Sequence, residues 1–312
     1  MSREPKFDTA HCQELDSAVS PYAARELYFN EDFTEYFGRK LTFACNDSKC
    51  RAPLVAVNIY TARRPKQALH FRTRPGGVHD EDCEYQPPTV AVPARLVPGR
   101  EPWGYKHTRY PSEFLLHPAE SPLHPGLRIE EREYIGEPAA RSKSGAVEGH
   151  HPRDSVLRTS SLDAVVDCFL NAPEEDLATH LLTIGKKTRY FKNWFKRINY
   201  FQDAEGLIYW GQVDQLKKYG SDYRVRFANY IWENEQKLRI YIYIKGSTID
   251  AYSKRRLFRE QLDGFIDSKS EILCFFVAAY PQRTKVSYDN RSWEQYDVRV
   301  EQLDHLVFTF AR

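Results

Sequence analysis

The chain has 312 residues, of which 41% are hydrophobic and 14% aromatic, so it can bury a sizeable core in two or three domains. Its formal net charge of +2 means that nucleic-acid binding would have to come from local basic patches. No apolar run approaches the roughly 20 residues that span a bilayer, and the N-terminus has no apolar signal core. We therefore expect a cytoplasmic protein with no membrane partner.

Residues 1–86 are predicted to form a small zinc-ribbon-like module. A short strand over residues 41–44 precedes an alternating apolar run over residues 53–62, and a second strand returns over residues 68–71. The intervening Arg-Arg-Pro-Lys segment is typical of a turn. This pattern predicts a β-hairpin with polar turns at both of its ends.

The polar turns carry the candidate metal ligands. Cys45 and Cys50 are separated by four residues, and His79 and Cys83 are separated by three. Two short ligand pairs joined by a strand-like segment are typical of a structural zinc site, and thiolates favour zinc over magnesium or calcium. A closed site of three thiolates and one imidazole leaves no open position for water, so we expect a structural role. His70 is an alternative to His79 as the nitrogen ligand.

The Cys45/Cys50 pair, the His70-Phe71 dipeptide and the His79/Cys83 pair give residues 40–85 a resemblance to the N-terminal zinc-finger-like module of competence CoiA-like proteins. That resemblance implies DNA handling in a bacterial DNA-processing, mobile-element or anti-phage defence system. It also implies a restriction-nuclease-like domain after the module.

The sequence departs from the pattern of such a nuclease. A magnesium-dependent core of this type needs an Asp on one strand and Glu-x-Lys on the next. The best candidate strand ends in Ile-Tyr-Ile-Lys, so Tyr243 occupies the place of the glutamate. A metal-dependent nuclease is therefore kept only as an alternative, with its residues drawn from Asp214, Asp222, Glu235 and Lys237.

Two segments connect the zinc module to the C-terminal region. Residues 87–155 hold most of the prolines and have little apolar periodicity, so they are predicted to form a Pro-rich connector. The sequence leaves open whether this connector is ordered.

Residues 156–205 are predicted to be helical, with a first helix near residues 162–170 and a second over residues 174–184. They end in a basic and aromatic stretch. Three of its cations are candidate phosphate contacts, against the alternative of a solvated basic face: Lys192, Lys196 and Arg197.

Residues 206–312 are predicted to form an OB-like five-stranded β-barrel. The sequence indicates strands at 207–216, 223–232, 238–244, 272–280 and 298–310, with one helix at 253–265 between the third and fourth. Gly211 in the first strand fits a sharp bend. The fold class is therefore mostly β with a small helical segment (α+β).

Strand alternation then predicts a binding face. Leu238, Ile240, Ile242 and Ile244 would face the core, so the residues between them face outward. Outward tyrosines can stack on bases, and cations can contact phosphates. The predicted nucleic-acid-binding residues on this face are Arg224, Arg226, Arg239, Tyr241, Tyr243 and Lys245.

The sequence thus favours a non-catalytic protein that binds single-stranded DNA or RNA and carries a structural zinc module. One alternative is the nuclease described above. A second is an adaptor subunit whose barrel docks a protein partner from the same system, such as a helicase or a nuclease, because Tyr and Arg are also frequent at protein interfaces. A solvated face with no ligand is the third reading of the same side chains.

Overall fold

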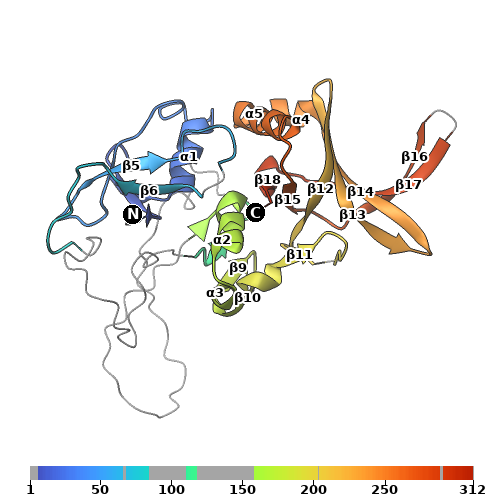
Figure 1. The fold of residues 1–312 in the computed structure, drawn as a ribbon, viewed down its shortest axis with the longest axis horizontal. Helices are drawn as coiled ribbons and strands as arrows, with labels where there is room; N and C mark the ends of the chain where they lie inside the picture. Colours follow the sequence, from blue (N-terminus) through green and yellow to red (C-terminus); the bar gives the residue numbers. More distant parts are fainter. Residues whose placement is uncertain are drawn as a thin grey trace, which may run out of the picture.

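The computed structural model describes residues 6–65, 68–83, 110–117, 158–202, 204–288 and 291–311. The N-terminal residues lie at one end of the elongated molecule and the C-terminal sheet at the other, with residues 158–197 between them (Figure 1). Most of the predicted Pro-rich connector lies outside the described residues. Within the described part, no helix has the length and apolarity needed to cross a membrane.

The N-terminal module is a six-stranded antiparallel sheet with one helix. The sheet has the order β1-β6-β5-β4-β2-β3. Its strands are β1 (Lys6–Phe7), β2 (Ala10–Cys12), β3 (Ser17–Val19), β4 (Phe43–Ala44), β5 (Pro53–Val57) and β6 (His70–Thr73). Helix α1 (Pro21–Phe29) begins at Ser20, whose hydroxyl accepts a hydrogen bond from the Ala23 amide, and proline occupies the first turn.

The predicted hairpin is present as β5 and β6, which pair from Leu54 opposite Thr73 to Val57 opposite His70. It is not isolated, because β1 and β4 flank it on either side. Residues from α1 and from all six strands form a buried apolar core that includes Leu27, Phe43 and Phe71. The module therefore has a hydrophobic core of its own, separate from the cysteine cluster.

The middle segment contains less helix than the sequence predicted. Helix α2 (Leu162–Asn171) is confirmed, and α3 (Glu174–Thr179) follows it. The predicted continuation of the second helix to Ile184 is wrong, because residues 181–184 form a strand. The basic stretch after Gly185 likewise contains no α-helix and forms two short strands around a short 3-10 helix. Its elements are β9 (Leu181–Ile184), β10 (Lys187–Tyr190), the 3-10 helix η2 (Phe191–Trp194) and β11 (Phe195–Arg197).

The reason for this difference is visible in the sequence around Gly185. Leu182 and Ile184 are buried while their neighbours are not, which is a two-residue period rather than a helical one. Gly185 has φ of 61°, which closes the turn between β9 and β10. With β7 (Glu113–Phe114) and β8 (Arg158–Thr159), these strands form a four-stranded sheet of order β10-β9-β7-β8.

The C-terminal half is one large curled sheet with two helices. Its path runs β16-β17-β14-β13-β12-β15-β18, with β11 paired alongside the start of β12. The elements are β12 (Ile208–Tyr219), β13 (Asp222–Glu233), β14 (Gln236–Ile244), α4 (Gly246–Asp250), α5 (Arg255–Ile266), β15 (Ile272–Val277), β16 (Gln282–Tyr288), β17 (Arg291–Val298), the 3-10 helix η3 (Leu303–His305) and β18 (Leu306–Phe310).

The fold is mostly β, as predicted, but the described strands of the predicted OB-like five-stranded barrel do not close: they form an open sheet with edges at β16 and β18. The predicted order of three strands, a helical segment and a fourth strand is present. The strands β12, β13 and β14 form a meander, helices follow, and β15 returns to pair with β12. The strand predicted over residues 298–310 is shorter than expected. It is β18, which pairs antiparallel with β15, and η3 lies directly before it. The strand that runs parallel to β14 is β17, which ends at Val298 where the predicted strand was to begin.

The hairpin of β16 and β17 was not predicted. No strand was predicted between residues 281 and 297, which hold all of β16 and nearly all of β17. The available signal was the pair Asp289-Asn290 between two runs with alternating Val, Tyr and Trp residues. Such a pair of turn-forming residues between alternating runs is typical of a hairpin connection.

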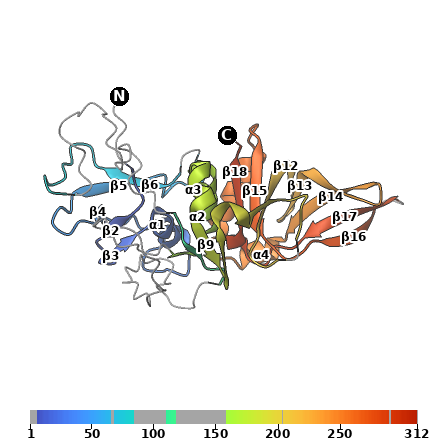
Figure 2. The ribbon, with the colours of Figure 1, turned by 90° about the horizontal axis from the view of Figure 1, so that it is seen from below.

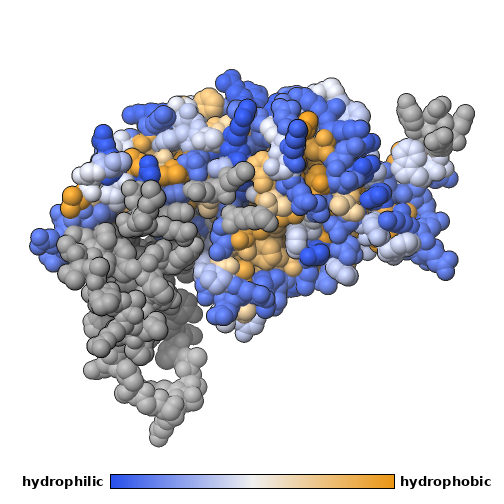
Figure 3. All heavy atoms as spheres, viewed as in Figure 1, coloured by the Kyte–Doolittle hydropathy of each residue, from blue (hydrophilic) through white to orange (hydrophobic). Residues whose placement is uncertain are grey.

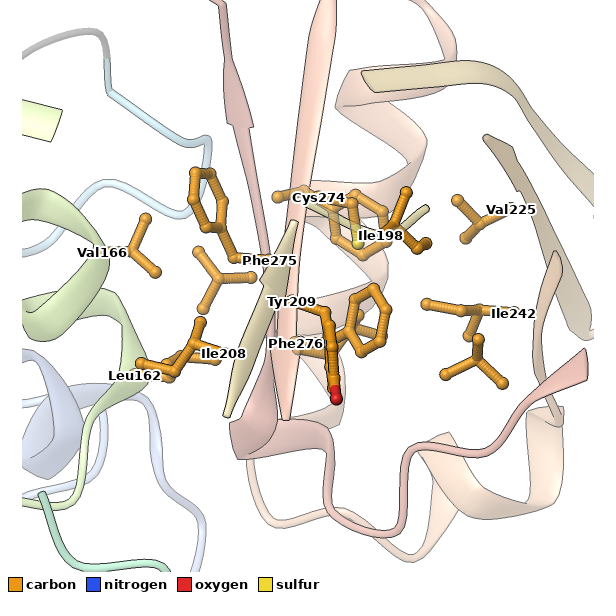
Figure 4. Close-up of a cluster of buried hydrophobic side chains, with 14 of the residues drawn as sticks. Leu162, Val166, Ile198, Ile208, Tyr209, Val225, Ile242, Cys274, Phe275 and Phe276 are labelled. Carbon is orange, nitrogen blue, oxygen red and sulfur yellow. The ribbon is translucent and has the colours of Figure 1, made fainter. Parts of the chain in front are cut away.

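The core of this half lies on both sides of β12 and β15. Figure 4 shows Ile208 and Phe275 pointing toward Leu162 and Val166 of α2, while Tyr209 and Phe276 point the other way. On that second side they face β13 and β14, which contribute Val225 and Ile242 among others. The sheet therefore curls around an apolar interior, and α2 covers the outer surface of its β15 end. Figure 2 shows α2 and α3 standing between the N-terminal module and this sheet.

Gly211 has a packing role rather than the predicted bending role. A Cβ at this position would lie 2.7 Å from Ile198 Cγ2 and 3.1 Å from Phe227 Cδ1. The irregularity of β12 lies further along, between Val213 and Gln215, where the pairing with β13 shifts register. Glycine therefore allows the close approach of β11 and β13 to this strand.

Candidate functional site

The four predicted metal ligands come together. Their ligand atoms all lie within 4.8 Å of one another, and among the described residues this is the group of His, Cys, Asp or Glu that could hold a metal. Cys45 Sγ lies 3.7 Å from Cys83 Sγ. His79 Nδ1 lies 3.4 Å from the sulfurs of both Cys50 and Cys83. Tetrahedral zinc with the usual bond lengths has ligand–ligand distances of about 3.8 Å between sulfurs and about 3.6 Å between sulfur and nitrogen.

Local hydrogen bonds explain how each ligand pair is presented. After β4, the Asp47 carbonyl accepts from the Cys50 amide at 3.2 Å and the Asp47 side chain accepts from the Lys49 amide at 2.9 Å. This Asx turn folds the chain so that both sulfurs face inward. After β6, the Cys83 amide donates to the Asp80 carbonyl at 3.0 Å, which turns Cys83 back toward His79.

The surroundings of the cluster fit a closed metal site. Cys45, His79 and Cys83 are buried, and Cys50 is partly exposed. Thr73 Oγ1 lies 3.1 Å from His79 Nε2, which leaves Nδ1 directed at the sulfurs. Burial lowers the pKa of His79, so its imidazole is neutral near pH 7 and suited to bind a metal. The Asp80 amide also donates to Cys50 Sγ at 3.3 Å, a contact that stabilises a thiolate.

The structure separates the two histidines that the sequence left as alternatives. His79 belongs to the cluster, whereas His70 does not. His70 Nδ1 lies 3.0 Å from the Ala68 carbonyl, and the side chain is buried within β6. The geometry thus selects a Cys3His group that is compatible with a structural zinc ion.

The strand alternation predicted for the C-terminal sheet is present. Leu238, Ile240, Ile242 and Ile244 of β14 are buried, as are Tyr223, Val225 and Phe227 of β13. The side chains between them point outward together with their cross-strand partners on β12 and β17. We call this outward set the sheet face. It comprises Lys217, Tyr219, Arg224, Arg226, Tyr230, Trp232, Lys237, Arg239, Tyr241, Tyr243, Lys245, Trp293 and Gln295.

Aromatic rings of the sheet face are open to solvent. The exposed fractions are 50% for Tyr219, 63% for Trp232, 47% for Tyr243 and 42% for Trp293. Figure 3 shows the visible side of the C-terminal half as largely hydrophilic, with the more apolar residues gathered over the middle of the molecule. Single exposed hydrophobic side chains are common on protein surfaces, and it is a contiguous group of them that marks a candidate interaction surface.

Consecutive contacts join these rings across the strands. The Arg224 guanidinium lies over Tyr219 at 5.0 Å and over Tyr241 at 5.7 Å. Tyr241 and Tyr243 stack with ring centres 6.0 Å apart. The result is a band that passes from β12 through β13 to β14, with a cation between two aromatic faces.

Gln295 of β17 extends the band and is a residue that the sequence did not single out. Its side chain donates to Tyr243 Oη at 3.1 Å and to Asp297 at 2.6 Å, and it accepts from Trp293 Nε1 at 3.1 Å. It is only 1% exposed although it lies on the outward side. Gln295 therefore fixes the positions of two exposed rings on neighbouring strands.

The outward carboxylates are already engaged. Asp214 pairs with Arg226 at 2.6 Å, Asp222 accepts from the Gly246 amide at 2.7 Å, and Asp297 accepts from Gln295 and Thr284. Arg226 is thereby partly neutralised. The other cations of the sheet face have no ion-pair partner among the described residues.

The three predicted cations of the middle segment lie apart from the sheet face. Lys192 is in η2, and Lys196 and Arg197 are in β11, which pairs with the first residues of β12. Lys192 and Arg197 are exposed, and Arg197 lies over the Trp210 ring at 4.9 Å. Phe191, Trp194 and Phe195 are buried, so the aromatic residues of this stretch face the core.

The alternative nuclease residues are not brought together. Asp222 begins β13, whereas Glu235 lies in the turn after its end, so about 11 residues of extended strand (about 36 Å) separate them. Lys237 lies over the Tyr230 ring at 3.7 Å. In the part of the chain that is described, these acids form no group that could share a metal.

Buried ion pairs at the junction of the two halves were not predicted. Arg64, from the loop after β5, pairs with Asp163 and at 2.9 Å with Asp167 of α2. Tyr22 of α1 donates to Asp167 at 2.7 Å, and burial raises its pKa, which keeps the hydroxyl protonated. These contacts attach the N-terminal module to the middle segment.

A second junction site lies at the loop between α4 and α5. Lys254 contacts Glu26 of α1 at 2.5 Å and also pairs with Asp304 of η3, which accepts from Tyr252 at 2.6 Å. Although burial opposes its charge, the carboxylates of Asp304 and Glu26 raise the pKa of Lys254 well above its ordinary value. The ammonium group is therefore retained as a cation between the two halves.

A comparison with protein-family models, curated proteins and solved structures found no significant match for this chain. The resemblance to the CoiA-like module therefore rests on the cysteine and histidine residues quoted for it, and it assigns no family. A DNA-processing, mobile-element or anti-phage context stays a prediction.

Proposed function

We propose that this protein binds single-stranded nucleic acid on the sheet face, without catalysis, and that its N-terminal module holds a structural zinc ion. The observation that carries the proposal is the band Tyr219–Arg224–Tyr241–Tyr243, in which rings and a guanidinium alternate on an open sheet. Exposed rings stack on bases whatever their sequence, and nearby cations bind the phosphates.

The strand pairing supports this assignment. The topology resembles an OB-type sheet with a divided last strand. It has a three-stranded meander followed by helices, β15 returns to pair with β12, and β17 runs parallel to β14. OB folds bind oligonucleotides over their second and third strands, which correspond here to β13 and β14. Helix α5 lies on the inner side of the sheet, where Phe258, Leu262 and Phe265 are buried in the common core and Phe265 contacts Phe308 and Phe310 of β18, so it leaves the sheet face open.

The first test removes two rings of the band. Tyr241→Ala combined with Tyr243→Ala should weaken binding of a fluorescent oligothymidylate by roughly 30-fold or more, because each stacked base contributes about 1–3 kcal/mol. Phe37→Ala, which removes a ring exposed to 37% on the N-terminal module, is the matched control and should bind normally. Unchanged affinity in the double variant, with thermal unfolding as in the parent, would refute the choice of face.

The second test concerns the phosphate contacts. Arg224→Gln should lower the slope of log affinity against log salt by about 0.7, the value for one phosphate contact on a single strand. Lys192→Gln with Arg197→Gln measures in the same way whether the middle segment also contacts phosphates. Full-length protein with no affinity for DNA or RNA oligomers at low salt would favour the adaptor alternative instead.

A further inference from the structure

Resting on the proposed function, we infer that the sheet face has two stacking clusters and therefore selects single strands of about seven or more nucleotides over shorter ones. The first cluster is the band of Tyr219, Arg224, Tyr241 and Tyr243. The second lies at the other end of β13 and β14 and comprises Tyr230, Trp232, Lys237 and Arg239.

The second cluster combines aromatic rings with cations, as the first one does. The rings of Tyr230 and Trp232 meet edge to face with centres 5.7 Å apart. Lys237 Nζ lies 3.7 Å and Arg239 lies 6.0 Å from the centre of the Tyr230 ring. Two rings and two cations are thus placed together on adjacent strands, with Trp232 the most exposed aromatic side chain of the sheet face at 63%.

Cross-strand register places all four side chains on the outward side. Tyr230 pairs with Arg239 and Trp232 pairs with Lys237, whereas the intervening pair, Ile231 with Leu238, points inward. Trp293 extends this cluster onto β17, because the pairing of Arg239 with Gln295 puts Trp293 level with Lys237. The cluster therefore spans three strands, as the first one does.

A register shift separates the two clusters. The regular pairing of β13 with β14 is interrupted between Arg226 and Tyr230, so the two ends of the hairpin are distinct ladders. The pairs extend from Lys237 opposite Trp232 to Ile244 opposite Tyr223, which is a length of about 23 Å at about 3.3 Å per residue.

That length sets the size of the ligand. A strand with stacked bases advances about 3.4 Å per nucleotide, so about seven nucleotides cover both clusters from end to end. A tetranucleotide is about 14 Å long at this spacing and therefore cannot cover both clusters in full. An oligomer that reaches both clusters gains from the high effective concentration of its second end, so its affinity should rise steeply once it is long enough.

The test is an affinity series with oligothymidylates of about 4, 7, 10 and 15 nucleotides on the full-length protein. Wild type should gain more than about 100-fold between the 4-mer and the 10-mer and little beyond it. Tyr230→Ala with Trp232→Ala should reduce 10-mer affinity at least about 30-fold while changing 4-mer affinity about twofold at most, since one cluster is left.

The double variant Tyr241→Ala with Tyr243→Ala should behave in the same way. Lys237→Gln with Arg239→Gln is a second variant of this cluster, which removes its cations and keeps its rings. Thermal unfolding verifies that each protein is folded. If no oligomer binds at low salt, the proposed function fails. If wild type binds but gains affinity only in proportion to length, or if one pair of substitutions abolishes 4-mer binding and the other has no effect, the two-cluster inference fails while the function stands.

Discussion

At the scale of single residues, metal binding depends on which imidazole nitrogen and which cysteine sulfurs lie close enough together to share one ion. Cys45, Cys50, His79 and Cys83 come from two turns about 30 residues apart in sequence, and the turns are held by Asp47 and Asp80. His70 lies only a few residues before His79 in the sequence and could therefore have been a ligand. It lies instead in β6, where its side chain faces the Ala68 carbonyl. The choice between the histidines is therefore one of backbone geometry.

Replacing a ligand should remove the metal. Cys83→Ser is expected to lower bound zinc well below about one ion per chain, because a site with three remaining ligands binds zinc far more weakly. His70→Gln is the control and should retain the metal. Zinc content of the purified proteins, measured by mass spectrometry, distinguishes the two. Retention of stoichiometric zinc by Cys83→Ser would contradict the ligand set.

Gly211 permits a second residue-scale prediction. Gly211→Ala should destabilise the protein by about 1–3 kcal/mol, because its Cβ would lie 2.7 Å from Ile198 Cγ2 in a packed core. Gly264→Ala in α5 is the matched control, since no atom lies within 4 Å of the added Cβ and alanine favours a helix. Urea unfolding should show opposite shifts, and a neutral Gly211→Ala would mean that β11 can move away from β12.

At the scale of elements, the N-terminal module has two separate sources of stability. Its apolar core joins α1 to the six-stranded sheet, whereas the cysteine cluster holds only the turns after β4 and β6. The predicted β-hairpin between two ligand turns was too simple a description, since β1, β2 and β3 were not anticipated and they flank or extend the hairpin sheet. Their two or three residues each are too short to give a recognisable period.

Removal of the metal should therefore act locally. A chelator is expected to speed hydrogen exchange at the amides of Cys45, Cys50 and Cys83, which bond within the two turns. Amides of the β5–β6 ladder, such as those between Val55 and Arg72, should stay protected. Exchange measured by mass spectrometry tests this. Simultaneous loss of protection over the whole module would show that the apolar core cannot persist without the metal.

At the scale of the whole molecule, buried charges join the two halves. Lys254 has a side-chain exposure of 13% and contacts carboxylates from both halves, Glu26 and Asp304. Arg64 plays the equivalent part between Asp163 and Asp167, with a side-chain exposure of 7%. Buried charges are stable only when paired, so separating the halves leaves each of these groups without its partner.

Lys254→Met should weaken this attachment. We expect a loss of roughly 2 kcal/mol in unfolding free energy, less than for a fully buried pair because the Asp304 side chain is 40% exposed. Arg256→Met, whose side chain is 78% exposed beside Glu31, is the control and should cost little. Urea unfolding gives both values, and equal losses would mean that the junction does not depend on the buried ion pair.

The pH dependence of that loss follows from the two pKa shifts. Although burial acts in the opposite sense, Lys254 lowers the pKa of Asp304 below its ordinary 3.8, so the contribution of Asp304 is present above that pH and is lost as pH falls through the folded value. The pKa of Lys254 is raised above 10.5, so its contribution is present below that pH and is lost only as pH rises through its higher folded value.

The difference between wild type and Lys254→Met should therefore be constant between about pH 5 and about pH 9 and shrink below about pH 4. Unfolding of both proteins by urea across this range is the measurement. A difference that increases toward low pH would contradict the assignment of Asp304 as the ionised partner.

The sequence alone determined what depends on short-range pattern. Alternation of Leu238, Ile240, Ile242 and Ile244 defined the outward residues of β14, and two ligand pairs on polar turns defined the metal cluster. Both are periodic or local signals, since strand geometry and turn chemistry act over a few residues. The same reasoning failed at residues 181–197, where basic and aromatic residues suit a helix as well as a strand.

Tertiary structure decided everything that depends on which distant segments meet. It placed Arg224 between Tyr219 and Tyr241, connected Gln295 by hydrogen bonds to Tyr243 and Trp293, and left the C-terminal sheet open with edges at β16 and β18. It also paired Lys254 with Glu26, more than 200 residues away in sequence. Such contacts depend on strand register and on the burial of charge, which are properties of the assembled core and of no single stretch of sequence.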